Sequence, residues 1–479
     1  MNQSIGLAGI ATIFATVYAM SHNRHAINWR LVVCGICLQV ILAVFILQTP
    51  WGQGLFQVLG RTVETLLGFA SYGASFVLGP LNDAEKMTAL FGPAGAFIFI
   101  FKLVPTLIFV SSLSALAYYL GVMQKIVEFI AYVIYRIMGA SGSEATSNTA
   151  SVFIGMLEAQ LLIRPFLSKA TESELVAILA GSMACISGGM MAVYMQMGIA
   201  AEFMMAASVM AIPGALVISK IMYPEVEQSV TRGRIKLSLE KKSVNALDAV
   251  ASGAVEGLKV GVAASAVLIA ILAFIAMIDF GIGKAGLFLA ATFFDPTAPA
   301  IVLNMNLNEL TLGGVLGAIF YYPAIVMGVP VQDAAAVGGL MGTKLVVNEF
   351  VAYSQMIPLI EGGVLQPKSE LIATFALCGF ANFGSVAILI GGVGGMAPDR
   401  RHDLARVGLR AMICGTLASY LAASIAGIMY AQNVAATSPS VLKPVLVILA
   451  AGTVILVYTV KHERGINSDT AADAHGDRH

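Results

Sequence analysis

The sequence predicts an all-α polytopic membrane protein. Of its 479 residues, 58% are hydrophobic and only 11% are charged, and the mean hydropathy is +0.85. This composition lies outside the range of ordinary soluble globular chains. About nine apolar runs also have the 17 to 25 residues that a helix needs to cross a bilayer. Both observations indicate a chain that crosses a membrane many times.

The candidate spans follow one another along the whole chain. The opening residues lack the basic start and the small-residue cleavage site of a signal peptide, so we expect them to form the first span. Two stretches, 51–80 and 121–138, have charges on one side of a helical pattern, which is typical of helices that lie in the membrane interface. Further apolar pieces broken by polar residues lie at 140–170, 281–330 and 333–365. The candidate spans lie near residues 5–20, 30–48, 94–120, 173–198, 201–222, 257–278, 370–396, 408–430 and 441–460.

Positive charge predicts the orientation of these spans. Cytoplasmic loops carry the excess of Lys and Arg, and basic residues here follow the first, third, fifth and seventh spans. We therefore expect a periplasmic N-terminus. Segment 140–170 then enters from the cytoplasmic side, and segment 333–365 enters from outside.

These two segments have parallel contents. Each is Gly-rich and apolar with an embedded acid, and about 30 residues further on comes a helix interrupted by Gly and polar residues, "MACISGGMMAVY" and "CGFANFGSVAILIGG". Re-entrant hairpins and broken helices need protein or water around their freed backbone groups, so they mark a cavity near the midplane. We therefore predict an inverted repeat, typical of secondary transporters. The expected parts are an N-terminal scaffold (1–92), a first repeat (93–222), a second repeat (245–430) and an extra C-terminal span with a polar tail (431–479).

The embedded acids are Glu158 and Glu349. A charge at the centre of a span costs roughly 2.5 to 3.5 kcal/mol on insertion scales, so it needs a partner or a function. A structural interpretation pairs the acids with Arg164 and Lys344 on the same hairpins. A functional interpretation makes them two halves of a binding site, and their matching places in the two repeats favour it.

The composition also disfavours several classes of function. The 27 basic and 27 acidic residues balance, which leaves no basic excess for binding nucleic acid. The six histidines lie in polar loops or the tail, and the five cysteines lie in apolar stretches, so neither set forms a metal-binding or disulfide pattern. The sequence has no P-loop, H-E-x-x-H or G-x-S-x-G motif, and we expect no enzyme activity and no cofactor. GxxxG spacings such as Gly253 to Gly257 indicate ordinary helix packing.

The string around Glu349, "GTKLVVNEFVAY", resembles the G-x-K-x-x-x-N-E-F-V-A signature of the concentrative nucleoside transporters. The resemblance covers roughly residues 28–430. It includes "PTLIFVSSLSALAYYLGVMQ" at 105–124, "NALDAVASGAVEGLKV" at 245–260 and "CGFANFGSVAILIGGVGGMAPDRRHDLARVGLRA" at 378–411. It implies transport by alternating access in a homotrimer whose protomers each have their own site.

The resemblance also implies a set of residues that bind the sugar. In that family the Glu of the external hairpin and the Asn and Ser of the following broken helix hold the ribose hydroxyls. The matching residues here are Glu349, Asn382 and Ser385. A carboxylate accepts two hydroxyl hydrogens, and Asn supplies both a donor and an acceptor, which suits the vicinal hydroxyls of a ribose.

The cytoplasmic hairpin departs from the family pattern. In the family this hairpin resembles N-I-F-V-G-Q-T-E, and its Gln, Thr and Glu contact the nucleobase. This chain has "SVFIGMLE" at the matching place. Met156 and Leu157 replace Gln and Thr, and only Glu158 survives. Losing two polar groups beside a base costs about 1 to 3 kcal/mol per group left unpaired. Either Glu158 and waters read the base, or the ligand is less polar at that end.

The same difference from the family pattern affects the predicted binding site of the coupling ion. The family's Asn that helps to bind Na+ corresponds to Ser151, which retains one oxygen. Backbone carbonyls near Ile154 and the helix break around Ser187 are further candidate ligands for Na+. Some members of the family couple to H+ instead, and with no intramembrane histidine that proton would be carried by Glu158 or Glu349.

We therefore predict a multi-pass transporter of the bacterial inner membrane that imports a nucleoside or related riboside by cation symport. The alternatives are a diverged member that carries a non-standard substrate with a less polar base, and a channel lined by the same hairpins. The apolar run 441–460 would form an extra span and place the tail from Lys461 in the cytoplasm.

Overall fold

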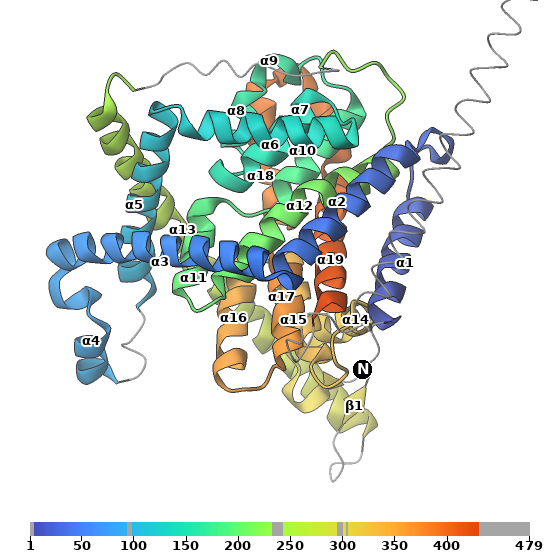
Figure 1. Cartoon of the computed structure of the whole chain (residues 1–479). Helices are drawn as coiled ribbons and strands as arrows, with labels where there is room; N and C mark the ends of the chain where they lie inside the picture. The colour runs from blue at the N-terminus through green and yellow to red at the C-terminus, as the bar shows by residue number, and fades with distance from the viewer. Residues whose placement is uncertain (1–3, 93–97, 232–242, 295–299, 303–304, 431–479) are drawn as a thin grey trace, which may run out of the picture.

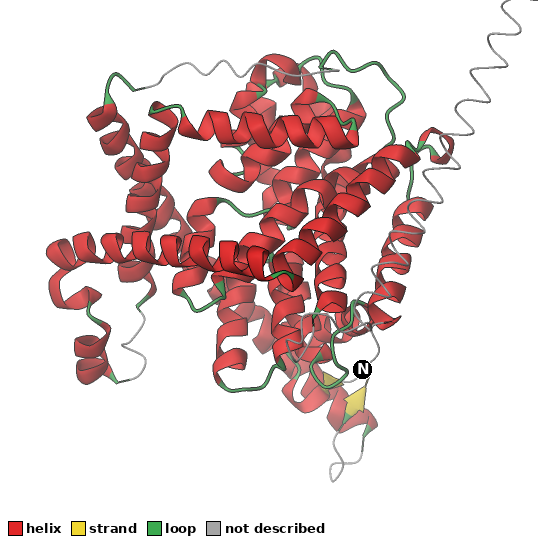
Figure 2. Cartoon of the chain, in the orientation of Figure 1, coloured by secondary structure: helices red, strands yellow, loops and turns green. Residues whose placement is uncertain are grey.

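The computed structural model describes residues 4–92, 98–231, 243–294, 300–302 and 305–430. In these ranges the chain is almost entirely helical (Figures 1 and 2). The one strand pair among them is β1 (Ile301–Val302), which runs antiparallel to β2 (Met305–Asn306). Six of the described helices are long and apolar enough to cross a membrane. The all-α prediction is confirmed, while the candidate span 441–460 and the tail lie outside the described residues.

The N-terminal part contains α3, a helix of 29 residues that crosses other helices. Thr49 caps α3 by accepting from the Gly52 amide, and Pro50 occupies its first position, where no backbone donor is needed. Figure 1 shows α3 running across α5 and α13. Helices at 51–80 and 121–138 were predicted and are present as α3 and α6. The helices of this part are α1 (Ser4–Ala19), α2 (Trp29–Gln48), α3 (Pro50–Leu78), α4 (Ala84–Phe91), α5 (Phe99–Tyr119) and α6 (Val122–Met138), with short η1 (Arg24–Ala26) and η2 (Gly79–Asn82) between them.

The first repeat contains a hairpin followed by a broken helix. Capping boxes start α7 and α10: the Ser141 and Thr171 side chains each accept from the amide three residues on, and the glutamate at that position accepts from the cap amide. The break falls between α10 and α11, inside the expected span 173–198. The elements are α7 (Gly142–Ile154), α8 (Glu158–Leu162), α9 (Arg164–Leu167), α10 (Glu172–Ala184), α11 (Gly188–Gln196) and α12 (Ala201–Met222).

The second repeat has the same order of elements. A hairpin, α15 and α16, precedes a helix that is broken between α17 and α18. The two hairpins lie at opposite ends of the molecule (Figure 1), as an inverted arrangement requires. The elements are α13 (Ala246–Phe293), η4 (Leu307–Glu309), α14 (Leu312–Val326), α15 (Ala334–Val346), α16 (Glu349–Glu361), α17 (Pro367–Leu377), α18 (Phe383–Met396), η5 (Pro398–Arg400) and α19 (Arg401–Met429).

Two details of this half correct the prediction. The span expected at 257–278 is only the middle of α13, which has 48 residues and is about 72 Å long at 1.5 Å per residue. The apolar pattern weakens at Asp279, but a helix continues wherever no residue breaks its hydrogen bonds. The stretch 281–330, expected as broken pieces, contains the end of α13 and all of α14. Asp279 joins these two helices because its Oδ1 accepts from the Leu312 amide at 2.7 Å.

The two helix breaks cross one another in the core. Gly379 has φ of 119°, and a Cβ there would lie 2.6 Å from the carbonyl oxygen of Ala184 at the first break, so only glycine allows this approach. The hydroxyl of Ser419 on α19 donates to the Cys378 carbonyl at 2.7 Å. Backbone groups that are freed by breaking a helix inside a membrane need such partners. The crossing therefore fixes both breaks against α19.

The base of the first hairpin holds a buried cluster of charges. Lys220, near the end of α12, forms ion pairs with Glu144 and Glu225, and both Lys220 and Glu144 are buried. Glu174 accepts from three hydroxyls, those of Ser143, Ser229 and Thr231. These contacts join α7, α10 and α12 at one end of the molecule.

Candidate functional site

The two embedded acids occupy equivalent places in the hairpins. Glu158 is the first residue of α8 and Glu349 is the first residue of α16. Gly155 makes the turn before Glu158 with φ of 107°, and a Cβ there would lie 2.7 Å from Glu158 Oε2. Asn348 makes the corresponding turn by capping α16, accepting from the Val351 amide at 2.9 Å. Each acid therefore sits at a helix N-terminus just after the tip of its hairpin.

Glu349 lies in a buried polar group formed by both repeats. Its Oε1 accepts from the Tyr194 hydroxyl of α11 at 3.0 Å, and its Oε2 accepts from Asn382 Nδ2 at 3.2 Å. Asn382 caps α18, because its Oδ1 accepts from the Ser385 amide at 2.8 Å. Glu349 is 5% exposed and Asn382 is 3% exposed. The structure therefore brings Glu349, Asn382 and the backbone amide of Ser385 together and places Tyr194 beside them.

The structural interpretation of Glu349 as a partner of Lys344 is not supported. The Lys344 ammonium is fully buried and donates to the Ala376 carbonyl at 3.2 Å. Among the described residues, the hydrogen-bond partners of the Glu349 carboxylate are Tyr194 and Asn382. Lys344 therefore stabilises the end of α17 rather than neutralising the acid by direct contact.

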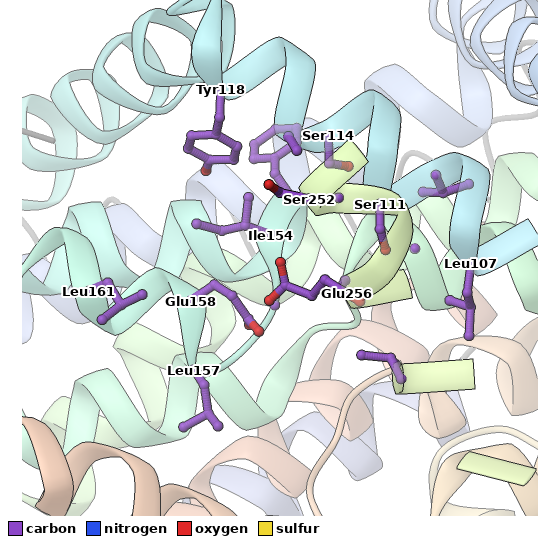
Figure 3. A pocket seen from close by; sticks show the side chains of 18 of the residues that line it. Leu107, Ser111, Ser114, Tyr118, Ile154, Leu157, Glu158, Leu161, Ser252 and Glu256 are labelled. Atoms are coloured by element: carbon purple, nitrogen blue, oxygen red, sulfur yellow. The ribbon is translucent and has the colours of Figure 1, made fainter. Parts of the chain in front are cut away.

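Glu158 faces a cavity of about 720 Å³. The hairpin contributes Ile154, Met156, Leu157 and Glu158 to its wall, and the first helix break contributes Ser187. The opposite wall is formed by α5 and α13 (Figure 3). Its polar groups include Ser111, Ser114 and Tyr118 from α5 and Ser252 and Glu256 from α13. The tip of the first hairpin thus lies at this cavity.

The sugar-side residues do not line this cavity. Glu349, Asn382 and Ser385 are buried, whereas Phe380, two residues before Asn382, is part of the cavity wall. The cavity therefore reaches the break that carries the sugar-side residues without exposing them. In this conformation the predicted base side is open and the predicted ribose side is closed.

The candidate ion ligands fall into two different surroundings. Ser151 is buried and donates to the Ser147 carbonyl at 2.8 Å. Beside it, Gln160 Nε2 donates to the Ser182 hydroxyl at 2.7 Å and to the Met156 carbonyl at 3.1 Å. Ser187 instead caps α11 at the cavity wall, which Ile154 also lines. The described residues contain no group of three His, Cys, Asp or Glu side chains that could hold a metal ion.

The sequence prediction missed Tyr194, Tyr118 and Glu256. A tyrosine in an apolar run needs a partner for its hydroxyl when it is buried, and this signal pointed to Tyr194 without naming its partner. Glu256 lies in the string 245–260, directly before the expected span 257–278. It lacks a matching acid in the other repeat, and the repeat was the criterion that selected the first two acids.

Three family models match successive parts of the chain. "Na+ dependent nucleoside transporter N-terminus" matches residues 8–81, "Nucleoside recognition" matches residues 100–201, and "Na+ dependent nucleoside transporter C-terminus" matches residues 203–427. Together these matches cover most of the chain, including both hairpins and both broken helices.

Relatives match over almost the same length. An uncharacterized transporter of Haemophilus influenzae is 38% identical over 436 residues, which are 90% of this chain and 98% of the relative. Nucleoside permease NupC of Helicobacter pylori is 33% identical over 89% of this chain and 98% of its own length. Mouse sodium/nucleoside cotransporter 1 is also 33% identical, over 89% of this chain and 64% of its own length.

Solved structures share the fold. The structure of CNTnw in an inward-facing substrate-bound state has a TM-score of 0.82 and 36% identity, and it covers 91% of this chain and 100% of that one. A variant of CNTnw in an outward-facing state gives a TM-score of 0.82 with 37% identity over 90% of this chain and 98% of that one. The chain is thus similar to the same protein in two states.

Proposed function

This chain belongs to the family of sodium-dependent, concentrative nucleoside transporters, and we propose that it imports a nucleoside or a related riboside by cation symport. It is a membrane transporter and not an enzyme. Solved relatives in inward-facing and outward-facing states support transport by alternating access.

The observation that carries the proposal is the buried group around Glu349. An ionised carboxylate has about four lone-pair positions, and Tyr194 and Asn382 occupy one position on each oxygen. The remaining positions suit the two vicinal hydroxyls of a ribose. Asn382 cannot turn its amide round without losing the cap on Ser385, so its donor is held toward the carboxylate. This group is therefore organised to bind a sugar.

The nucleobase would occupy the cavity beside Glu158. Met156 and Leu157 offer it apolar contact from the hairpin, and polar groups face it from α5 and α13. A cavity of about 720 Å³ lies within the range of small-molecule sites. Ligands that bind both parts would span from the cavity to the break at Phe380. Closing the structure around such a ligand would join the two parts.

Na+ is the coupling ion that family membership favours, and H+ is the alternative. The oxygens around Ser151 already accept from side-chain donors, since Gln160 donates to both Ser182 and Met156. A sodium ion at that place would share these oxygens with Gln160 or displace it. The carboxylates of Glu158 and Glu349 remain the candidate proton carriers. We place the protein in the bacterial inner membrane as a homotrimer with one site per protomer.

Uptake into liposomes tests the proposal. The full chain, reconstituted with a Na+ gradient or a pH gradient, should accumulate labelled uridine or adenosine above the external concentration, and an ionophore should abolish the accumulation. Equilibration without accumulation would indicate a channel. Failure of both unlabelled nucleosides to compete would favour a non-standard substrate. Glu349→Gln should remove uptake, whereas Glu361→Gln, at the exposed end of the same helix, should not.

A further inference from the structure

Three glycines hold one face of α13 tightly against α5. A Cβ on Gly253 would lie 2.7 Å from the Ser111 carbonyl oxygen, and a Cβ on Gly257 would overlap the Leu107 carbonyl. A Cβ on Gly261 would lie 3.1 Å from Val104. Small residues at four-residue spacing allow such close packing of membrane helices. The rotation of α13 about its axis is therefore fixed along this stretch.

This rotation directs Glu256 into the cavity. Ser252, Glu256 and Val260 each precede one of the three glycines, so they form a neighbouring stripe on α13, and all three line the cavity. Figure 3 shows the carboxylates of Glu256 and Glu158 pointing toward one another from opposite walls. The acid that the sequence prediction passed over therefore faces the acid at the hairpin tip.

A third polar group points into the same space. Tyr118 of α5 directs its hydroxyl toward the region between the two acids (Figure 3). Its oxygen is buried and has no hydrogen-bond partner within the described part of the chain. A buried hydroxyl without a partner is unfavourable. The Tyr118 hydroxyl is therefore available to a ligand that fills the cavity.

The carboxylate of Glu256 favours ligands that present a hydrogen-bond donor to it. An ionised carboxylate only accepts hydrogen bonds, and the described lining contains two acids but no lysine, arginine or histidine. A bound base that presents carbonyl oxygens to Glu256 would be repelled. A base that presents an exocyclic amino group would donate to Glu256, and hydrogen bonds to charged groups are among the stronger ones.

We propose that Glu256 is a specificity-determining residue that selects nucleosides whose base carries an exocyclic amino group. The inference rests on the proposed transport of nucleosides and names the substrates within that class. It also explains how a hairpin that lost two polar residues, at Met156 and Leu157, still serves a polar base. The polar contacts come from α13 and α5 instead.

Pairs of ligands that differ by one amino group test this inference. Guanosine differs from inosine, and adenosine differs from purine riboside, by such a group. We would measure the Kd of all four on the purified full chain in lipid nanodiscs. In at least one pair, the nucleoside with the amino group should bind at least about tenfold more tightly than its partner without it, as expected for a hydrogen bond to a charged group. In Glu256→Gln this preference should fall below about threefold.

Controls separate charge from folding. Glu256→Asp keeps a carboxylate and should retain part of the preference, while Lys259→Gln changes a charge on the same helix outside the cavity lining and should retain all of it. If no nucleoside binds the unmodified chain, the proposed function fails. If nucleosides bind without an amino preference, or if Glu256→Gln keeps the preference, this inference is overturned while the proposed function stands.

Discussion

Replacing Glu349 by glutamine should remove most of the affinity for ribosides. The change preserves the size of a side chain that is 5% exposed, so it tests charge and hydrogen bonding rather than packing. The glutamine oxygen can still accept from Tyr194, but its NH2 group would then face Asn382 Nδ2, which now donates to the carboxylate at 3.2 Å. Asn382 cannot turn round without losing the cap on Ser385. The substitution therefore sets two donors against each other.

The magnitude follows from the bonds that a ribose would make. Hydrogen bonds to a charged group contribute about 1.5 to 3 kcal/mol each, compared with about 1 kcal/mol for neutral pairs. The substitution removes the charged acceptor of two hydroxyls and places two donors opposite each other. Together these changes should weaken the binding free energy by about 3 kcal/mol. Since 1.4 kcal/mol corresponds to a factor of ten, the Kd of a riboside should rise at least about a hundredfold.

The assay compares a riboside with its 2′-deoxy and 3′-deoxy analogues on the unmodified chain and on Glu349→Gln. The four Kd values for each hydroxyl form a double-mutant cycle that isolates the contact between that hydroxyl and the carboxylate. We expect the unmodified chain to discriminate against both analogues and the variant to bind all three ligands with similar, weak affinity. Glu361→Gln is the matched control on α16. A variant that still discriminates as strongly as the unmodified chain would remove Glu349 from the sugar site.

Three further outcomes are expected. Restoring polar residues with Met156→Gln and Leu157→Thr should tighten binding of uridine by about tenfold, measured by competition, because Glu256 cannot donate to its carbonyl oxygens and each polar group left unpaired costs about 1 to 3 kcal/mol; no gain would mean that the base does not contact the hairpin. Gly257→Ala should lower the unfolding midpoint and weaken binding, because overpacking costs about 1 to 3 kcal/mol, whereas Gly281→Ala on the same helix has nothing within 4 Å of the added carbon and should be neutral. Lys220→Met should destabilise the chain by about 3 to 5 kcal/mol in chemical unfolding, because it leaves the buried carboxylate of Glu144 uncompensated, and an undiminished stability would contradict this.

The hairpins and their acids could be predicted because their signals are local. A carboxylate in an apolar run is costly wherever it occurs, and Gly-rich turns and interrupted helices can be recognised within about twenty residues. The cap at Asn382 is also local, since it binds an amide three residues away. These features specify that Glu158 and Glu349 begin their helices and that Asn382 caps α18, without any knowledge of the rest of the chain.

Tyr194 and Glu256 could not be assigned in the same way, because their roles depend on contacts between distant segments. The Tyr194 hydroxyl reaches Glu349 across 155 positions of sequence. The direction of Glu256 depends on the packing of α13 against α5, which the glycines at 253 and 257 allow but do not reveal. The sequence prediction was right that these glycines serve helix packing. It could not tell which neighbouring residue that packing would turn toward a ligand.

The position of the polar groups also changes the interpretation of the first hairpin, whose sequence differs from the family pattern at Met156 and Leu157. Met156 and Leu157, taken alone, favour a ligand that is less polar at its base end, because a hairpin without hydrogen-bonding side chains cannot satisfy a base. A ligand in a cavity responds to the sum of donors and acceptors around it, whichever helix supplies them. Glu256 and Tyr118 supply that chemistry from the opposite wall. The hairpin has lost two polar residues, but this does not mean that the site has lost polar recognition of the base. It favours instead a site that contacts a different edge of the base.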